Sequence, residues 1–439
     1  MPTPLRHVAV VGAGPSGIFA AAELVKRPDL HVDVFDRLPT PFGLVRYGVA
    51  PDHITIKRVA AALTRTLTHP RVRFVGNVTV GTDVTLDRLR GAYDRVLVAT
   101  GAPHARELGI PGEDLPGVYS AADLVSWYNG HPLGGIGFTT DTDSVAVVGA
   151  GNVSLDVARV LLKGGAGLAE TDVPDPVLAA LDRRPVRDVH IIVRRSVADV
   201  KFSPPELAEF ERIDDLDLVV DPEQLSLGPD ALARYGSDRT VAARVDTFRS
   251  WAARPHTGAG RRLHVHFLRS PVEVLGTGSV EALLLQVTAV GPAGRVATSR
   301  SETLPVGAVV RSVGYRAAPL PGLPFDADQG LVPHAEGYVG DRTHVVGWVK
   351  RGPSGVIGTN KACAIDSVRV LLAALDADPA RIDGAERTAL LAELAEVEVT
   401  WPGWIAIDDA EQARGAASGR VRTKITDVAE MVAIARSSC

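Results

Sequence analysis

The chain has 439 residues, 46% hydrophobic and 23% charged, and because a domain usually takes about 150 residues we expect two or three domains. Its 47 basic and 52 acidic residues give a formal net charge of −5, which argues against a nucleic acid or an anionic membrane as a general partner. The cysteines, Cys363 and Cys439, are too few for a disulfide framework, and without an export signal or a long apolar run the chain is predicted to be cytoplasmic and not inserted in a membrane.

The first predicted element is a strand, a glycine-rich turn and a helix at residues 7–26. In it, Gly12, Gly14 and Gly17 form G-x-G-x-x-G, a spacing that permits a tight turn and lets backbone N–H groups approach a pyrophosphate at the helix N-terminus. Nineteen residues after Gly17, the next predicted strand ends at Asp36, whose carboxylate can accept hydrogen bonds from a ribose and would repel a 2′-phosphate. The pattern therefore predicts a site for FAD or NAD and not NADP. The structural alternative is a plain surface turn.

The same pattern recurs at residues 144–163, after a further predicted strand at residues 95–101. Gly149, Gly151 and Ser154 occupy this second turn, with serine at the third position. Serine there is expected to loosen the packing of helix on strand without obstructing a phosphate. Two such turns in one chain predict two dinucleotide-binding units.

The second unit carries the opposite charge at the end of its next predicted strand, residues 189–193. Arg194 and Arg195 follow this strand, and their planar, permanently charged guanidinium groups suit a 2′-phosphate, so the second site is predicted to take NADP(H). Alternatively, the two arginines only solvate the end of the strand. The interval from the turn to Arg194 is about twice the usual one, which we assign to an insertion at residues 162–184.

The remaining elements continue the alternation of strands and helices. Residues 263–268 and 280–287 are predicted to form an antiparallel pair, and residues 308–316 a strand that ends in glycine. A cluster of prolines at residues 319–324 marks a boundary, because proline interrupts both helix and sheet. One more strand and turn then lead to a helix near residues 356–374.

These elements predict an α/β protein with two Rossmann-like dinucleotide-binding domains. The domain for the second nucleotide, NADP(H), at residues 105–318, is inserted into a discontinuous FAD domain made of residues 1–104 and 319–439. Two such sites in one protein suggest that a hydride donor, NADPH, is paired with a flavin acceptor, FAD.

Three segments carry a resemblance to a known family. Residues 38–53 (LPTPFGLVRYGVAPDH), 151–162 (GNVSLDVARVLL) and 347–360 (GWVKRGPSGVIGTN) are similar to the signature segments of the adrenodoxin reductase family, whose bacterial members are ferredoxin–NADP reductases. The similarity covers nearly the whole chain. It implies a two-domain flavoenzyme that passes electrons from NADPH through FAD to a one-electron iron–sulfur partner, an acidic ferredoxin.

Matched by position, the resemblance implies two sets of cofactor contacts. The FAD set is Gly12, Gly14, Pro15, Ser16, Gly17, Asp36, Leu44, Val80, Trp348, Gly355, Val356 and Ile357. The NADP(H) set is Gly151, Asn152, Val153, Ser154, Arg194, Arg195 and Glu206. His53 and Glu209 are implied to lie near the nicotinamide, where they would orient its carboxamide or tune the local charge. The alternative is that His53 only begins a helix and Glu209 lies on a solvated helix face, and no metal ligand is expected.

The sequence departs from the family pattern at several of these positions. Asp36 stands where the family usually has glutamate, Val193 and Ser196 stand where glycines are common, and Ala208 stands where an arginine is often found. The changes at 193 and 196 bear on the approach to the 2′-phosphate, and the change at 208 bears on partner docking. Nothing in the pattern gives a role to Cys439.

Three other functions use the same nucleotide pair. A disulfide reductase needs two neighbouring cysteines, which the sequence lacks. A flavin monooxygenase and a non-enzymatic redox sensor whose flavin does not turn over stay open. Long-range attraction to an acidic ferredoxin is one interpretation of a set of basic residues that are otherwise simply solvated: Arg183, Arg184, Arg187, Arg244, Arg249, Arg261 and Arg262.

Overall fold

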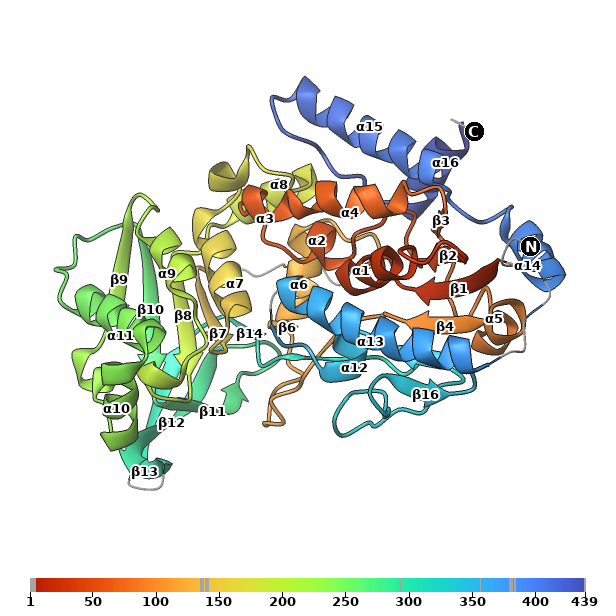
Figure 1. The fold of residues 1–439 in the computed structure, drawn as a ribbon. Coiled ribbons are helices and arrows are strands. Elements are labelled where there is room, and N and C mark those ends of the chain that lie inside the picture. The colour runs from red at the N-terminus through yellow and green to blue at the C-terminus, as the bar shows by residue number, and fades with distance from the viewer. Residues whose placement is uncertain are drawn as a thin grey trace. The chain divides into compact units, whose positions relative to one another are not determined.

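The computed structural model describes residues 5–134, 138, 142–291, 294–355, 357–378, 382 and 384–437 (Figure 1). The chain divides into two compact units, which we describe separately as unit 1 and unit 2. Unit 1 is drawn from Met1–His104, Asn129–Pro132 and Tyr315–Cys439, and unit 2 from Ala105–Tyr128 and Leu133–Gly314.

This division differs from the predicted domain boundaries in two short segments, residues 129–132 and 315–318, which belong to unit 1. Lys424 donates a hydrogen bond of 2.9 Å to the backbone carbonyl of Asn129. The backbone N–H of Ala317 donates to the carbonyl of Gly330, 3.0 Å away. Both contacts are with residues of unit 1, namely Lys424 and Gly330. The proline cluster and the strand pattern in the sequence did not indicate either contact.

The sheet of unit 1 has six strands, mostly parallel. Their order is β16 (Tyr338–Gly340), β17 (Thr343–Val345), β4 (Arg95–Val98), β1 (Arg6–Val11), β2 (Leu30–Phe35) and β3 (Val72–Val75). β1 pairs in parallel with β2 and β4, and β17 pairs in parallel with β4. The last third of the chain therefore completes the sheet that the first residues begin.

Alternating side chains cover both faces of this sheet with apolar core. Val8 and Val10 face one core and Ala9 and Val11 face the other. The first core is covered by α1 (Pro15–Leu24), α4 (Val59–Leu67), α13 (Ile357–Ala377), α15 (Trp401–Ala417) and α16 (Val428–Ser437), and the second by α5 (Leu86–Ala92) and α14 (Gly384–Leu394). In Figure 1, α1 and α13 lie side by side against the sheet.

A buried ion pair fixes the short helix α2 (Leu44–Tyr47) against the C-terminal helices. Arg46 donates to Glu411 of α15 over 2.5 Å, and both side chains are almost fully buried. Burial opposes the charge of Arg46, but the facing carboxylate prevails and raises its pKa. Because removing one partner of such a pair leaves a buried charge unpaired, the position of α2, and of Leu44 at its start, is tightly held.

The sheet of unit 2 also has six strands, and all its pairs are parallel. Their order is β6 (Val118–Ser120), β14 (Ala308–Arg311), β7 (Ser144–Val148), β8 (Asp188–Val193), β10 (Arg261–Phe267) and β9 (Leu216–Val220). The helices α6 (Ala121–Tyr128), α7 (Asn152–Lys163), α8 (Asp175–Arg183), α9 (Pro204–Phe210), α10 (Pro229–Ser237) and α11 (Arg239–Ala252) share one apolar core with this sheet. The predicted insertion forms the end of α7, a 3₁₀ turn (Ala166–Leu168) and α8.

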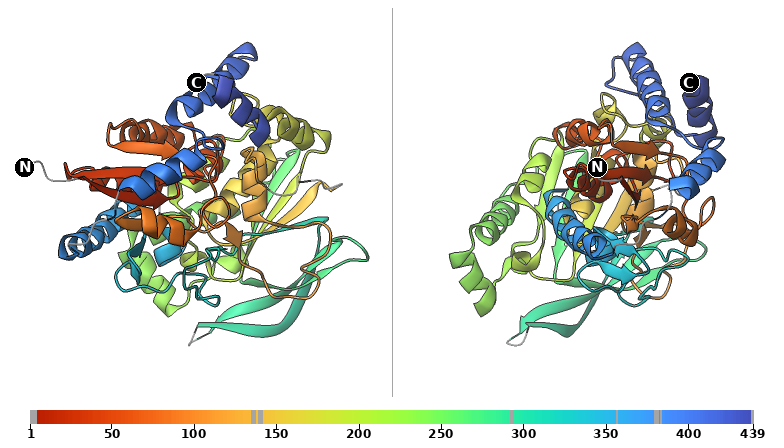
Figure 2. Two further views of the ribbon diagram at one scale, coloured as in Figure 1. Left: turned by 90° about the vertical axis from the view of Figure 1, so that its right-hand side faces the viewer. Right: turned by 45° about the vertical axis from the view of Figure 1, so that its right-hand side comes forward.

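The predicted antiparallel pairing of residues 263–268 with 280–287 is wrong. β10 lies in the parallel sheet between β8 and β9, and β12 (Ala282–Gly291) pairs antiparallel with β11 (Arg269–Leu275) and β13 (Gly294–Pro305). Leu268 has φ 57°, so the chain turns sharply after β10 and β11 takes the place beside β12. Both views of Figure 2 show β12 and β13 as a long hairpin of unit 2. Among the described residues, no helix is both long and apolar enough to cross a bilayer.

Candidate cofactor sites

The glycine turn of unit 1 leaves one of its three glycines open. A Cβ on Gly12, which has φ 115°, would lie 2.5 Å from the carbonyl oxygen of Ala99, and one on Gly17 would lie 1.9 Å from the carbonyl oxygen of Gly12. These two glycines are required by the packing of strand and helix. A Cβ on Gly14, the residue before Pro15 at the start of α1, would meet nothing within 4 Å. The open side of Gly14 therefore has room for a phosphate.

Asp36 fastens this turn from the end of β2. Its Oδ2 accepts from the backbone N–H of Ala13 over 2.7 Å, and its Oδ1 from that of Leu38 over 2.9 Å. Burial raises the pKa of Asp36, and the two backbone hydrogen bonds oppose that rise. Each carboxylate oxygen keeps a further acceptor position, so the side chain can hold the turn and still accept from a ribose hydroxyl.

The segment before α2 lies on the same turn. The backbone N–H of Phe42, which has φ 82°, donates to the carbonyl of Ala13 over 2.8 Å. A Cβ on Gly43 would lie 3.0 Å from the Cα of Gly14. Leu44 comes next and is 45% exposed. The structure thus brings Gly43, which directly precedes the predicted FAD contact Leu44, against the open glycine, Gly14.

Ser16, a predicted FAD contact, lies against the residue that precedes Trp348, another predicted contact from the far end of the sequence. A Cβ on Gly347, which has φ 78°, would lie 2.2 Å from the Oγ of Ser16. Gly347 directly precedes Trp348, the first residue of α12 (Trp348–Arg351). The indole Nε1 of Trp348 is buried and has no hydrogen-bond partner in the described part of the chain. A buried donor beside an open glycine turn is what a bound dinucleotide with acceptor atoms would satisfy, so the residues present fit FAD.

The remaining members of the FAD set lie in three places. Val80 is buried in the second core of unit 1, next to Val78, whose N–H donates to the carbonyl of Asp36. Gly355 has φ 79°, and a Cβ there would lie 2.5 Å from the Oγ1 of Thr359. Ile357 begins α13, and Val356, like Cys439, lies outside the described residues.

The glycine turn of unit 2 repeats the geometry. A Cβ on Gly149 would lie 2.5 Å from the carbonyl oxygen of Ser312, whereas one on Gly151, at the N-cap of α7, would meet nothing within 4 Å. Ser154 is fully buried, and its Oγ donates to the carbonyl of Gly151 over 2.6 Å. The hydroxyl is satisfied within the turn, so serine at the third position leaves no unpaired polar group.

Two predicted NADP(H) contacts also position α9 on α7. The Oδ1 of Asn152 accepts from the N–H of Ser203 over 2.9 Å, at the start of α9. Glu206 accepts from Arg159 over 3.2 Å, and Arg159 also donates to Asp156 over 2.9 Å. Arg159 is fully buried, and we missed it in the sequence. The feature of the sequence that could have indicated it is an arginine within the apolar run VARVLL of α7.

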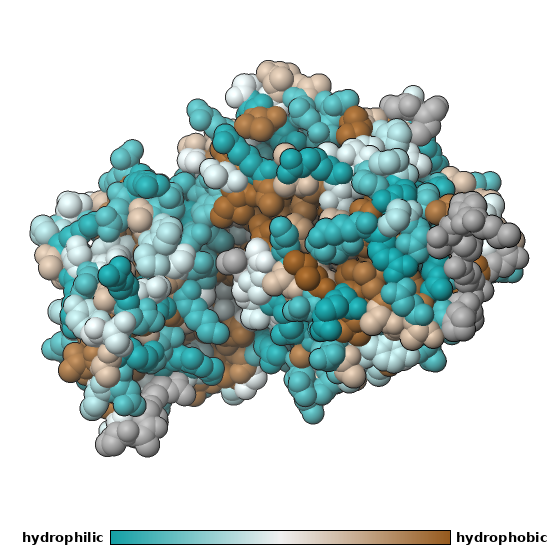
Figure 3. Space-filling view, viewed as in Figure 1, coloured by the Kyte–Doolittle hydropathy of each residue, from teal (hydrophilic) through white to brown (hydrophobic). Residues whose placement is uncertain are grey.

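Arg194 and Arg195 are both exposed directly after β8. Val153, another member of the NADP(H) set, is half-buried in the first turn of α7. The side chain of Val193 is buried in the core of unit 2, so valine there does not cover the surface that the arginines present. Ser196 donates to Asp199 over 2.7 Å. Although burial opposes it, this bond and one from Arg234 lower the pKa of Asp199. In the face shown in Figure 3, mostly hydrophilic residues cover the helices of unit 2 at the left.

His53 and Glu209 belong to different units. His53 is half-buried at the N-cap of α3 (Ile54–Lys57) in unit 1. Glu209 lies on α9 in unit 2 and pairs with Arg212 over 2.5 Å. Their joint place at a nicotinamide stays a prediction.

Comparison with known proteins decides the family. The model of a family described as pyridine nucleotide-disulphide oxidoreductase matches residues 6–212. Over 452 residues the chain is 42% identical to the NADPH-ferredoxin reductase FprA of Mycobacterium leprae, covering 99% of each protein. It is 36% identical to the mitochondrial NADPH:adrenodoxin oxidoreductase of Arabidopsis thaliana, covering 98% of this chain and 95% of that protein. The chain belongs to the adrenodoxin reductase family.

A solved structure of this family has the same fold. It is that of Mycobacterium tuberculosis FprA in complex with NADPH, with a TM-score of 0.91 at 39% identity over 98% of this chain and 100% of that one. The predicted family and the α/β class with two Rossmann-like units are therefore confirmed.

Proposed function

We propose that this member of the adrenodoxin reductase family is a ferredoxin–NADP(+) reductase, which passes electrons from NADPH through FAD to a ferredoxin-type iron–sulfur protein. The supporting observation is the contrast between the two turns. Asp36 closes the turn of unit 1, and Arg194 and Arg195 follow the corresponding strand of unit 2. The relatives named above are called NADPH-ferredoxin reductase and NADPH:adrenodoxin oxidoreductase. An acidic ferredoxin as the partner and the cytoplasm as the location are part of the proposal.

Bound FAD would supply the redox chemistry of this reaction, namely acceptance of a hydride from the nicotinamide and one-electron release to the iron–sulfur partner. The chain's own residues bind and orient. The backbone at Gly14 would receive the pyrophosphate and Asp36 would accept from the ribose. The other residues that would hold the flavin nucleotide are Ser16, Leu44, Val80, Trp348, Gly355, Val356 and Ile357. The partial positive charge at the N-terminus of α13 would stabilise negative charge on a reduced flavin bound beside it.

The residues of unit 2 bind the hydride donor, NADPH. Gly151 admits the pyrophosphate of NADPH at the N-terminus of α7, where the helix dipole favours an anion. Arg194 and Arg195 bind the 2′-phosphate through charge-assisted hydrogen bonds. Asn152 and Glu206 keep α9, which carries Glu209, in place relative to that turn.

A single assay separates this function from its alternatives. The purified protein should be yellow, bleach on addition of NADPH under anaerobic conditions, and reduce cytochrome c only when ferredoxin is added. Stoichiometric hydroxylation of an organic substrate would instead indicate a flavin monooxygenase. Bleaching without turnover of any ferredoxin would indicate a redox sensor. Reconstitution with each ferredoxin from the same source identifies the physiological partner.

We expect His53→Gln and Glu209→Gln each to slow flavin reduction by NADPH about tenfold, because both residues orient the nicotinamide and neither substitution changes side-chain size much. Stopped-flow absorbance of the flavin measures the rate. His104→Gln and Glu223→Gln, at exposed positions of unit 1 and unit 2, are matched controls that should react like the wild type. Unchanged rates and unchanged NADPH affinity in the first two variants would remove them from the site.

We also expect ferredoxin reduction to slow as ionic strength rises, since long-range attraction between a basic surface and an acidic partner is screened by salt. Within the basic set, Arg261 donates to backbone carbonyls and Arg262 forms a bidentate pair with Asp188. Arg183 and Arg187 are exposed and are better placed to attract a partner. Rates with a small uncharged acceptor at the same salt concentrations give the baseline, and parallel curves for the two acceptors would contradict the docking role.

A further inference from the structure

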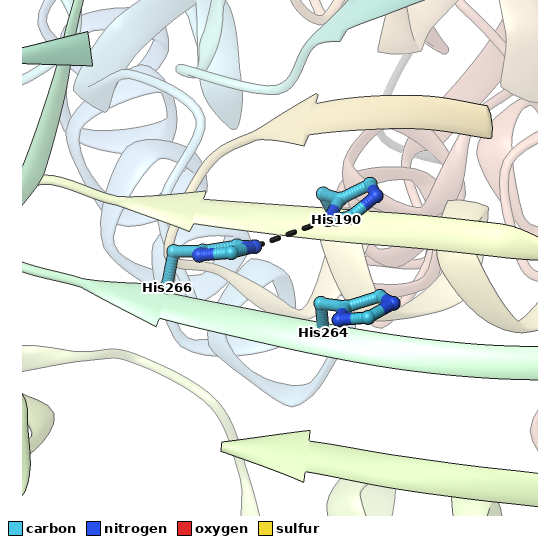
Figure 4. Close-up of side chains that lie close together, drawn as sticks. All are labelled: His190, His264 and His266. Atoms are coloured by element: carbon cyan, nitrogen blue, oxygen red, sulfur yellow. Dashed lines mark hydrogen bonds between the residues drawn. The ribbon is translucent and has the colours of Figure 1, made fainter. Parts of the chain in front are cut away.

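Three histidines of unit 2 gather on neighbouring strands, outside both glycine turns (Figure 4). His264 and His266 lie two residues apart on β10, so they point to the same face of the sheet. His190 on β8 is the register partner of His264. The opposite face of these strands, with Ile191 and Val265, belongs to the helix-covered core of the unit.

The imidazole nitrogens of this histidine cluster converge. One candidate ligand atom from each ring lies within 4.8 Å of the others. The Nδ1 of His190 and the Nε2 of His266 are 3.1 Å apart. Two nitrogens bound to one tetrahedral Zn²⁺ at about 2.0–2.1 Å are separated by about 3.3–3.4 Å, so this pair is already close to the spacing of a chelate.

A carboxylate fixes the third ring, that of His264, in the tautomer that leaves one nitrogen free to bind a metal ion. The Nε2 of His264 is 2.8 Å from the Oδ1 of Asp188, and a carboxylate only accepts, so Nε2 carries the proton. The lone pair is then on Nδ1. A carboxylate that orients an imidazole from behind is the usual support of a metal-bound histidine. Asp188 is itself held by Arg262 through two hydrogen bonds of 2.6 Å.

Burial disfavours the charged form of all three imidazoles, and a metal ion binds the neutral form. Burial lowers the pKa of His190 to about 3 and of His266 to about 4, and the neighbouring imidazole of His264 adds to both shifts. Burial also lowers the pKa of His264, against the opposing effect of Asp188. His264 and His266 are only partly buried, so an ion can reach them from solvent.

We propose that His190, His264 and His266 form a binding site for a divalent transition-metal ion of the Zn²⁺ class. Three neutral imidazoles with a water as fourth ligand are a known zinc ligand set, and nitrogen ligands select such ions over Mg²⁺ or Ca²⁺. The rings of His190 and His264 are stacked, with centroids 4.3 Å apart and planes 16° apart. Binding turns one of these rings toward the ion and replaces the His190–His266 hydrogen bond by two metal bonds. The proton of that hydrogen bond leaves the nitrogen that carries it and returns to the other nitrogen of the same ring, so each imidazole stays neutral.

Such an ion would join β8 to β10 in the unit proposed to bind NADP(H). β8 ends at Val193, directly before Arg194 and Arg195. The ion would therefore stabilise the folded unit by binding it and not the unfolded chain. The site is independent of the proposed function, and its test needs neither NADPH nor ferredoxin.

The experiment uses the full-length, tag-free protein with its flavin, freed of metal by a chelator. Zn²⁺ binding is measured by equilibrium dialysis with metal analysis, and thermal unfolding is recorded with Zn²⁺ or Mg²⁺. We expect one Zn²⁺ per chain at the cluster and a midpoint raised by Zn²⁺ but not by Mg²⁺. His266→Gln and His264→Gln should each weaken Zn²⁺ binding about tenfold or more and remove that rise.

His256→Gln is the matched control, because His256 is exposed in the same unit and outside the cluster. It should bind and respond to Zn²⁺ like the wild type. Circular dichroism of the metal-free variants checks that each is folded. Two cluster variants are made so that the test remains possible if one of them fails to fold. Zn²⁺ binding of unchanged strength in either folded cluster variant, or no stabilisation of the wild type by Zn²⁺, would overturn the proposal.

Discussion

Replacing Arg194 and Arg195 together by alanine should raise the KM for NADPH roughly 10- to 100-fold while leaving the KM for NADH nearly unchanged. Hydrogen bonds to a charged group are worth about 1.5–3 kcal/mol, and only NADPH carries the 2′-phosphate that the two guanidinium groups bind. Both side chains are exposed after β8, so their removal should not disturb the core of unit 2. Steady-state kinetics with both nucleotides at one ionic strength measures the difference.

Arg187→Ala is the control for this prediction. Arg187 is exposed just before β8, at the opposite end of the strand from the two arginines, so its loss changes the net charge without touching the 2′-phosphate. It should alter neither KM by more than about twofold. If the double variant raised the KM of NADPH and NADH equally, the assignment of the arginines to the 2′-phosphate would be wrong.

Gly14→Ala should lower the affinity for FAD by about tenfold or more while the protein stays folded. The new methyl group meets no protein atom within 4 Å, and Gly14 has φ −78°, which alanine adopts without strain. The methyl group would instead occupy the space through which a pyrophosphate approaches the backbone. Flavin content after purification and fluorescence titration of the apoprotein with FAD measure the loss.

Gly91→Ala is matched to this change. Gly91 lies in α5 of the same unit, and a Cβ there also meets nothing within 4 Å. Alanine favours a helix over glycine, so this variant should keep FAD and the wild-type fold. Retention of FAD by Gly14→Ala as tight as in Gly91→Ala would mean that the pyrophosphate does not lie at this turn.

The two glycine turns could be predicted because their information is local. Strand, glycine spacing and helix follow one another in the sequence, and each turn is built from adjacent residues. The pairing of β10 could not be predicted in the same way. Its residues show that it is a strand, but its partners β8 and β9 come from distant parts of the chain, and the sharp turn at Leu268 separates it from β12.

Contacts between distant residues explain what else was missed. Gly347 is required because Ser16 lies against it, and nothing in the neighbourhood of either residue indicates the other. The histidine cluster could not be predicted from the sequence for the same reason. His264 and His266 have the spacing of one strand face, but the third ring comes from another strand and only the register reveals it.

The pairing of β17 with β4 also sets an order of events during synthesis. Unit 2 is made almost entirely from one uninterrupted stretch, so it can collapse while the ribosome is still translating. Unit 1 has to wait, because Gly347 and Trp348 emerge some three hundred residues after the glycine turn they complete. Nascent chains halted before β17 would expose an unfinished sheet edge, and flavin loading belongs to the finished polypeptide.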